Sequence, residues 1–155
     1  LLPTIVSRCQ AVTIGRDREM AHGWLSGRWP AELLEEKLFE CGDAPLSVEA
    51  ALAAEEPPLA PLLRSLAAAS PVSKEIAGLL SWDIDRLTSG WYRHCVALLG
   101  GNSRVQGLTA DKALLCEFVD ELGSIRRQLL TTNSANQRIL YERLAARWQG
   151  AVHPA

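Results

Sequence analysis

The chain has 155 residues, of which 48% are hydrophobic and 22% charged, and its formal net charge is −2 at pH 7. This balance is typical of a globular chain and excludes an intrinsically disordered one. No apolar run approaches the roughly 20 residues that a membrane-spanning helix needs, and no secretory leader is recognisable. We therefore expect a cytoplasmic protein of one domain or two small ones, with no membrane partner.

Charge is distributed unevenly along the chain. Residues 1–80 carry seven Lys and Arg against eleven Asp and Glu, whereas residues 81–155 carry nine against seven. Most of the acid lies between Glu32 and Glu56, so this part should be repelled by a phosphate backbone. The weak basic excess of the second half does not by itself predict nucleic-acid binding.

The first ten residues, LLPTIVSRCQ, are interpreted as a short buried strand that ends in a polar turn. The β-branched run Thr4–Val6 favours an extended backbone, and Ser7-Arg8-Cys9 follows where the strand would leave its sheet. An arginine at such a rigid edge can reach a phosphate across a subunit boundary, because its planar, permanently charged fork matches phosphate oxygens. The triplet alone is equally compatible with an ordinary strand end and a solvated arginine.

Three short helices are predicted after this strand. Asp17 is a suitable N-cap for the first, which should end near Gly27. Pro30 suits the first position of the second helix, and Gly42 its end. The third helix should run from about Leu46 to Ala54. The apolar residues expected to face a common core are Met20, Trp24, Leu25, Leu33, Leu34, Leu38, Cys41, Val48, Ala51 and Leu52.

A domain boundary is predicted at Glu55-Glu56-Pro57-Pro58, because two consecutive prolines cannot continue a helix. Beyond it, apolar residues recur at steps of three and four, which predicts a bundle of about five helices. A stop is expected at Gly100-Gly101 and a helix cap at Thr109. The residues that form the stripes are Leu59, Leu62, Leu63, Leu66, Ile76, Leu79, Leu80, Ile84, Leu87, Trp91, Cys95, Leu98, Leu115, Phe118, Leu122, Ile125, Leu129, Leu140, Leu144 and Trp148.

Two stretches resemble a known family. Thr4-Ile5-x-Ser7-Arg8-Cys9, preceded by Leu-Pro, resembles the SRC motif of bacterial clamp-loader subunits, the AAA+ proteins that load the sliding clamp of DNA polymerase III. The stretch from Asn136 to Trp148 is similar to a closing helix of the same family. The resemblance implies a mainly all-α chain with a β remnant of the AAA+ core over residues 1–14, a lid over 15–57 and a helical collar over 58–155.

The resemblance also implies a function. Arg8 would be the trans-acting arginine finger of a neighbouring subunit's ATP site, with Ser7 and Cys9 as its motif neighbours, and the collar would assemble the ring. The partners would be gamma/tau and delta subunits, and primer-template DNA reached through the assembled complex. This chain, expected to be a C-terminal fragment without a phosphate loop, would hold no cofactor. ATP and Mg²⁺ would be bound by its neighbours, and the chain would not be an enzyme by itself.

The sequence differs from ATP-hydrolysing clamp-loader subunits at one point, which favours one type of subunit within the family. ATP-hydrolysing clamp-loader subunits open the third lid helix with a Gly-Ser-x-Arg-Asp type of sequence, whereas residues 42–49 here are GDAPLSVE and contain no arginine. This pattern resembles the subunit type that supplies a finger without hydrolysing ATP. Two alternatives stay open at this point. One is a gamma/tau-type subunit, and the other is an unrelated helical adaptor or ligand-binding domain.

The remaining chemistry-bearing residues form no recognisable constellation. The cysteines Cys9, Cys41, Cys95 and Cys116 stand far apart, which disfavours zinc and disulfides, and we expect Cys95 and Cys116 to be buried. No catalytic role is expected for His22, His94 or His153. The tryptophans Trp82, Trp91 and Trp148 are expected to anchor the core or an interface. Acidic residues interleave with Arg126, Arg127, Arg138, Arg143 and Arg147, so a solvated or interface surface is expected there.

Overall fold

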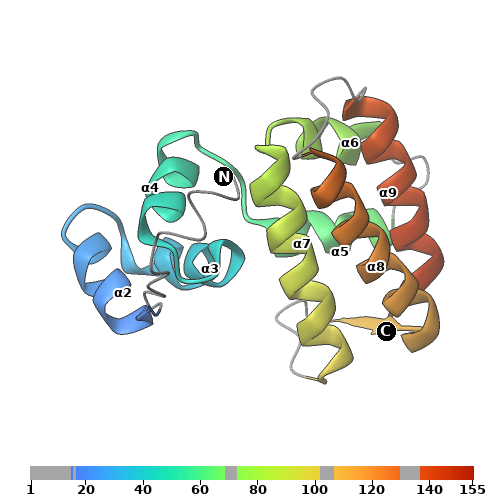
Figure 1. Cartoon of the computed structure of the whole chain (residues 1–155), viewed down its shortest axis with the longest axis horizontal. Helices are drawn as coiled ribbons and strands as arrows, with labels where there is room; N and C mark the ends of the chain where they lie inside the picture. The colour runs from blue at the N-terminus through green and yellow to red at the C-terminus, as the bar shows by residue number, and fades with distance from the viewer. Residues whose placement is uncertain (1–14, 16, 69–72, 102–106, 130–136) are drawn as a thin grey trace, which may run out of the picture.

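The computed structural model describes residues 15, 17–68, 73–101, 107–129 and 137–155. These residues form eight α-helices and one two-stranded sheet (Figure 1). The fold is therefore mainly all-α, as predicted. The predicted strand remnant over residues 1–14 lies outside the described residues. Within the described ranges, no helix is both long enough and apolar enough to cross a bilayer.

The first three helices are α2 (Arg18–Ser26), α3 (Ala31–Cys41) and α4 (Pro45–Ala53). The Asp17 side chain accepts a hydrogen bond from the Met20 backbone N–H, so it caps α2 as predicted. Gly42 ends α3 in the left-handed conformation, with φ of 63°. Pro30 was predicted to be the first residue of this helix, but it occupies the N-cap, and α3 begins one residue later at Ala31.

The following helices are α5 (Leu59–Ala68), α6 (Ser73–Leu80), α7 (Ile84–Leu99), α8 (Lys112–Leu129) and α9 (Gln137–Ala151). The predicted cap at Thr109 is wrong. The Asp111 carboxylate accepts from the backbone N–H groups of Ala113 and Leu114 and so caps α8. Thr109 instead lies in the strand β1 (Leu108–Ala110), because that backbone pairs with the end of the chain.

The sheet joins segments that are far apart in sequence. β1 pairs antiparallel with β2 (Val152–Pro154), and Ala110 lies opposite Val152. Val152 is fully buried and extends the core of the bundle beyond the end of α9. Strands of three residues have no periodicity to read in the sequence, so this pairing was not predicted.

The buried apolar residues form two separate clusters. The smaller comprises Ala21, Leu25, Leu34, Leu38, Cys41, Val48, Ala51 and Leu52, from α2–α4. The larger draws on α5–α9 and β2 and includes Trp91, Phe118 and Trp148, whose rings pack against one another. The clusters divide between Leu52 and Leu59, in the interval where the sequence predicts a boundary. We refer to α2–α4 as the three-helix unit and to α5–α9 with the sheet as the bundle.

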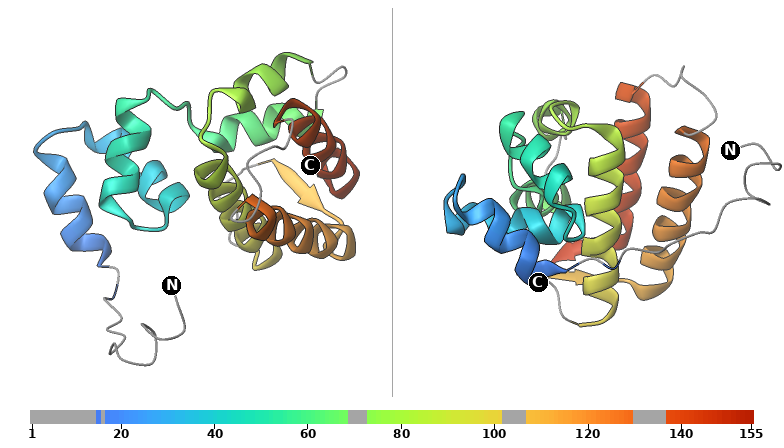
Figure 2. Two further views of the ribbon diagram at one scale, coloured as in Figure 1. Left: turned by 45° about the horizontal axis from the view of Figure 1, so that its top comes forward. Right: turned by 60° about the vertical axis from the view of Figure 1, so that its left-hand side comes forward.

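The two units lie side by side, and α3 packs against α7 (Figures 1 and 2). Gly90 on α7 permits this close approach. A Cβ at Gly90 would lie 3.0 Å from the Leu59 side chain and 3.4 Å from the Glu40 carbonyl oxygen. The linker over residues 54–58 runs along the same junction and carries Glu56, which is buried. Ionisable residues at this junction are therefore withdrawn from water.

Candidate functional site

The predicted finger Arg8 and its neighbours Ser7 and Cys9 lie outside the described residues, so the geometry of that site stays a prediction. Two other features of the described part have the form of sites. One is an apolar groove on the three-helix unit. The other is a network of buried charges where the unit meets the bundle.

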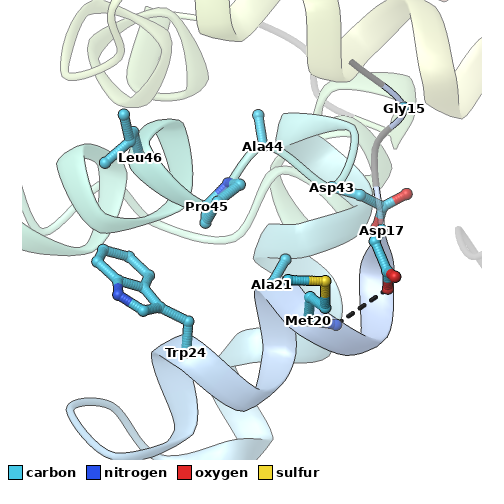
Figure 3. Close-up of a pocket in the computed structure, with 9 residues that line it drawn as sticks. All are labelled: Gly15, Asp17, Met20, Ala21, Trp24, Asp43, Ala44, Pro45 and Leu46. Carbon is cyan, nitrogen blue, oxygen red and sulfur yellow. Dashed lines mark hydrogen bonds between the residues drawn. The ribbon is translucent and has the colours of Figure 1, made fainter.

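The groove has a volume of about 590 Å³ and lies between α2 and the start of α4 (Figure 3). Its lining comes from two stretches, Gly15 with Asp17, Met20, Ala21 and Trp24 on one side and Asp43, Ala44, Pro45 and Leu46 on the other. Figure 3 shows Trp24 on α2 facing Pro45 and Leu46 across it. The groove begins at Gly15, beside the point where residues 1–14 join the described part.

The side chains of this groove correct one prediction. Met20 and Trp24 were expected to join Leu25 in the core, yet Met20 is 74% exposed and Trp24 42% exposed, whereas Leu25 is fully buried. The reason is geometric, because three short helices can enclose only one stripe of α2. Leu46, across the groove, is 72% exposed. A cluster of exposed apolar side chains of this kind is typical of a docking surface.

Ion pairs hold the two sides of the groove in place. Arg28 pairs with Glu49 on α4, and its guanidinium carbon lies 4.4 Å from the centre of the Trp24 ring. At the other end, Arg18 pairs with both Asp43 and Glu35. These pairs therefore link α2 to α3 and α4 at the two ends of the groove.

The start of α4 carries no basic residue of its own, and the nearby Arg18 is already paired with Asp43 and Glu35. Ala44 is the N-cap, Pro45 is the first residue, and neither side chain caps the helix. Asp43 precedes them in a left-handed conformation, with φ of 58°. The residues directly before α4 include the Asp43 carboxylate and no basic residue, which disfavours a polyphosphate chain at this helix start.

Among the described residues, the junction contains one fully buried ion pair and one that is partly buried. The Lys37 ammonium donates to the Glu40 carboxylate at 2.8 Å and to the Pro57 carbonyl at 2.9 Å, and it lies 4.1 Å from the centre of the Trp82 ring. Arg86 on α7 donates through two nitrogens to the buried Glu56 carboxylate. Hydrogen bonds to Glu56 raise the already high pKa of Arg86. These pairs connect both units to the linker.

Two acids of α3, Glu40 and Glu36, lie at the start of the first helix of the bundle. The Glu40 carboxylate accepts from the Leu59 backbone N–H, and Glu36 accepts a hydrogen bond from the Ala60 backbone. Both N–H groups stand at the start of α5, where negative charge is favourable. Burial, followed by repulsion from Glu40, nevertheless raises the pKa of Glu36 above its usual range.

His94 on α7 is buried within this junction. Its Nε2 lies 3.9 Å from a Glu40 carboxylate oxygen and its ring contacts Phe39 edge-on. Among the described residues, neither ring nitrogen has a hydrogen-bond partner. Arg93, next to it, donates to the Glu40 backbone carbonyl at 2.8 Å. The sequence analysis did not predict Lys37, Glu40, Glu56 or Arg86 as part of a site. The one feature that could have indicated burial is that Lys37 and Glu40 neighbour the apolar residues of α3.

The arginines of the bundle pair with neighbouring acids. Glu121 on α8 lies within ion-pair distance of Arg143 and Arg147 on α9, Arg138 pairs with Glu142, and Arg126 with Asp85. These contacts neutralise much of the positive charge on this surface. Among the described residues, these acids interrupt any continuous basic stripe, and the solvated or interface surface stays a prediction.

The structure also places the tryptophans, cysteines and histidines that the sequence analysis considered. Trp82, Trp91 and Trp148 are buried in the bundle core, as predicted. Cys95 is buried too, but the prediction for Cys116 is wrong, because it lies on the exposed face of α8. His22 and His153 lie far apart, on α2 and β2. Among the described residues, no group of three or more His, Cys, Asp and Glu side chains could hold a metal ion.

Comparisons with models of known protein families, with curated proteins and with solved structures found no match to this chain.

Proposed function

We propose that the chain is the C-terminal portion of a bacterial clamp-loader subunit of the AAA+ class. More particularly, we propose a subunit of the delta-prime type, which would supply Arg8 to a neighbouring subunit's ATP site without hydrolysing ATP itself. The observation that carries the proposal is the motif Thr4-Ile5-x-Ser7-Arg8-Cys9. The arginine would neutralise charge on the phosphoryl group during its transfer.

Three structural features support this proposal. A small three-helix unit precedes a larger helical bundle, which is the order of an AAA+ lid and a collar. The start of α4 carries Ala44-Pro45 without an arginine, which favours the non-hydrolysing type over a gamma/tau-type subunit. The exposed groove beside Gly15 would be covered by the AAA+ core that precedes the lid.

In the proposed complex, the bundle would pack against gamma/tau and delta subunits as part of a collar. Primer-template DNA would be reached only through the assembled ring, because the described arginines are largely paired with acids. ATP and Mg²⁺ would bind to neighbouring subunits. We expect calorimetric titration of residues 1–155 with ATP and Mg²⁺ to detect no stoichiometric site.

The decisive experiment replaces Arg8 in the intact subunit and reconstitutes the loader. Arg8→Ala should reduce DNA-stimulated ATP hydrolysis at the adjoining site by about 10³-fold or more, the scale typical of a lost arginine finger. Arg8→Lys should not restore full activity, because lysine lacks the planar fork. Arg64→Ala, at an exposed arginine of α5, is the matched control and should hydrolyse ATP at the wild-type rate. Wild-type hydrolysis by the Arg8→Ala loader would show that Arg8 is not a finger.

A further inference from the structure

The apolar groove between α2 and α4 has no cover in the described part of the chain. Met20, Trp24 and Leu46 line it and keep much of their surface exposed. Apolar side chains that stay in water forgo the free energy that their burial would contribute. The groove therefore favours an occupant that buries these three side chains.

The two acids that line the groove are already engaged. The Asp17 carboxylate accepts from the Met20 backbone N–H, and Asp43 pairs with Arg18. Neither carboxylate therefore requires a cation from an occupant. The other seven lining residues carry no charge. An uncharged, aliphatic segment fits this lining better than a charged ligand does.

The course of the chain selects one such segment. Gly15 lines the groove itself, and Figure 3 shows it at the opposite end from Trp24 and Leu46. The residues directly before Gly15 are Ala-Val-Thr-Ile, at positions 11–14, and they carry no charge. Because this segment is tethered at the groove, its effective concentration there is on the order of millimolar. It therefore competes well with any free partner.

The segment is also long enough. Four extended residues span about 13 Å, whereas α2 rises about 10 Å between Asp17 and Trp24. The chain would have to turn at Gly15, where the backbone is exposed and a Cβ would meet nothing within 4 Å. Glycine permits turns of either hand. Residues 11–14 can therefore reach Trp24 from Gly15.

We propose that residues 11–14 fold back along the groove as an extended segment, with Val12 and Ile14 against its apolar side chains. Side chains two residues apart lie on the same face of an extended segment, so Thr13 faces away. The proposal rests on the groove and on chain connectivity, and it does not depend on the clamp-loader assignment. If Arg8 is an arginine finger, this docking would fix its position relative to the three-helix unit.

The test uses residues 1–155 and the oxidation of Met20, the only methionine in the sequence. Hydrogen peroxide transfers one oxygen atom to the thioether sulfur and is itself reduced to water. Mass spectrometry of the tryptic peptide over residues 19–28, which contains no cysteine, follows the reaction. We expect Met20 to react about fivefold more slowly than N-acetyl-methionine methylamide, because only molecules with an open groove react quickly.

Two pairs of variants locate the cover. Ile14→Asp should remove most of the protection of Met20, because a carboxylate resists burial against apolar side chains. Thr13→Asp adds the same charge on the opposite face of the segment and should keep the protection. Leu46→Asp, on the far wall of the groove, should also lose it. Leu114→Asp, at an exposed leucine of α8, is the matched control and should keep it.

Circular dichroism of wild-type intensity shows that each variant is folded, and Ile14→Ser is the milder substitution should Ile14→Asp fail to fold. Three results would overturn the proposal: wild-type Met20 that reacts as fast as the free compound, unchanged protection in Ile14→Asp, or equal loss in Thr13→Asp. Protection that increases with protein concentration would also overturn it, because a second copy of the chain would then cover the groove.

Discussion

The three-helix unit and the bundle differ most in what fills their cores. Among the described residues, the buried apolar cluster of the unit has eight members and that of the bundle has nineteen. The unit has no aromatic side chain in its buried cluster, whereas Trp91, Phe118 and Trp148 meet at the centre of the bundle. A core of that size cannot offset much chain entropy, so the unit depends on additional contacts for its stability.

Those contacts are of two kinds: polar contacts with the linker and the bundle at the junction, and ion pairs within the unit. Lys37 and Glu40 of α3 are buried against the linker and the bundle, and Arg93 of α7 binds the end of α3. Within the unit, Arg18 and Arg28 tie α2 to the other helices. We therefore expect the bundle to be the more stable part, and the unit to depend partly on its polar contacts with the bundle.

The largest expected effect is in the aromatic core. Trp91→Ala should lower the free energy of unfolding by about 3–5 kcal/mol, because it removes a fully buried ring and leaves a cavity against Phe118 and Trp148. Urea denaturation followed by circular dichroism measures the change. The neighbouring Tyr92→Ala, at a side chain 41% exposed, should cost less than about 1 kcal/mol. Equal losses for the two variants would contradict the comparison.

The next largest loss of stability is expected at the junction. Lys37→Met keeps the stem of the side chain but leaves the Glu40 carboxylate buried without its cation, which should cost about 3 kcal/mol. Adding Glu40→Gln should recover part of that loss, since both charges are then gone. The exposed Arg138–Glu142 pair is the control, and Arg138→Met should cost at most about 0.5 kcal/mol. Hydrogen exchange should show faster opening of α2–α4 than of α7 in Lys37→Met, and equal acceleration in both would count against a dependent unit.

Alkaline pH should destabilise both units, because each buries a side chain, Tyr141 or Cys41, that ionises at high pH. Burial, with a smaller contribution from Asp83, raises the pKa of Tyr141 in the bundle to about 12, and burial raises the pKa of Cys41 in the unit to about 11. Because the folded pKa values exceed the unfolded ones, these groups favour folding at neutral pH, and the benefit is lost as pH rises from about 9 to about 12.

Urea denaturation between pH 8 and pH 11 tests this expectation. Tyr141→Phe should lose part of the alkaline destabilisation, and it should cost little at pH 8, since the buried Tyr141 hydroxyl has no hydrogen-bond partner in the described part of the chain. A fall in stability that is identical in wild type and Tyr141→Phe would exclude Tyr141 as a contributor.

A smaller effect is expected at the end of α3. Gly42→Ala should cost about 1–2 kcal/mol, because Gly42 has a φ of 63° and a Cβ there would meet the Arg93 guanidinium. Gly27→Ala is the matched control. Gly27 ends α2 with a φ of −75°, and a Cβ would meet nothing within 4 Å, so this variant should be neutral or slightly stabilising. Thermal unfolding of both variants would show whether the contact between the end of α3 and α7 matters.

The smallest effect is expected in the groove. Met20→Gln should change the free energy of unfolding by less than about 0.5 kcal/mol, because the side chain is 74% exposed. Leu25→Gln, on the same helix but fully buried, should be strongly destabilising. If Met20→Gln destabilises as much as Leu25→Gln, the groove is part of the core and not a free docking surface.

Local patterns in the sequence were enough for most of the helices. Helical periodicity located the bundle helices, Asp17 and Gly42 marked helix ends, and the proline pair marked the linker. These features succeed because capping and periodicity depend on residues within one or two turns. The motif at Arg8 likewise rests on neighbouring residues, and it stays a prediction.

Only the tertiary structure decided which face of each helix is covered. It left Met20, Leu33 and Cys116 exposed, replaced Thr109 by Asp111 as a cap, and paired β1 with the end of the chain. It also brought Glu56 of the linker together with Arg86 on α7, and Lys37 together with the Pro57 carbonyl, to form the junction. These outcomes depend on contacts between segments distant in sequence, and a local pattern carries no information about which partner reaches a given face.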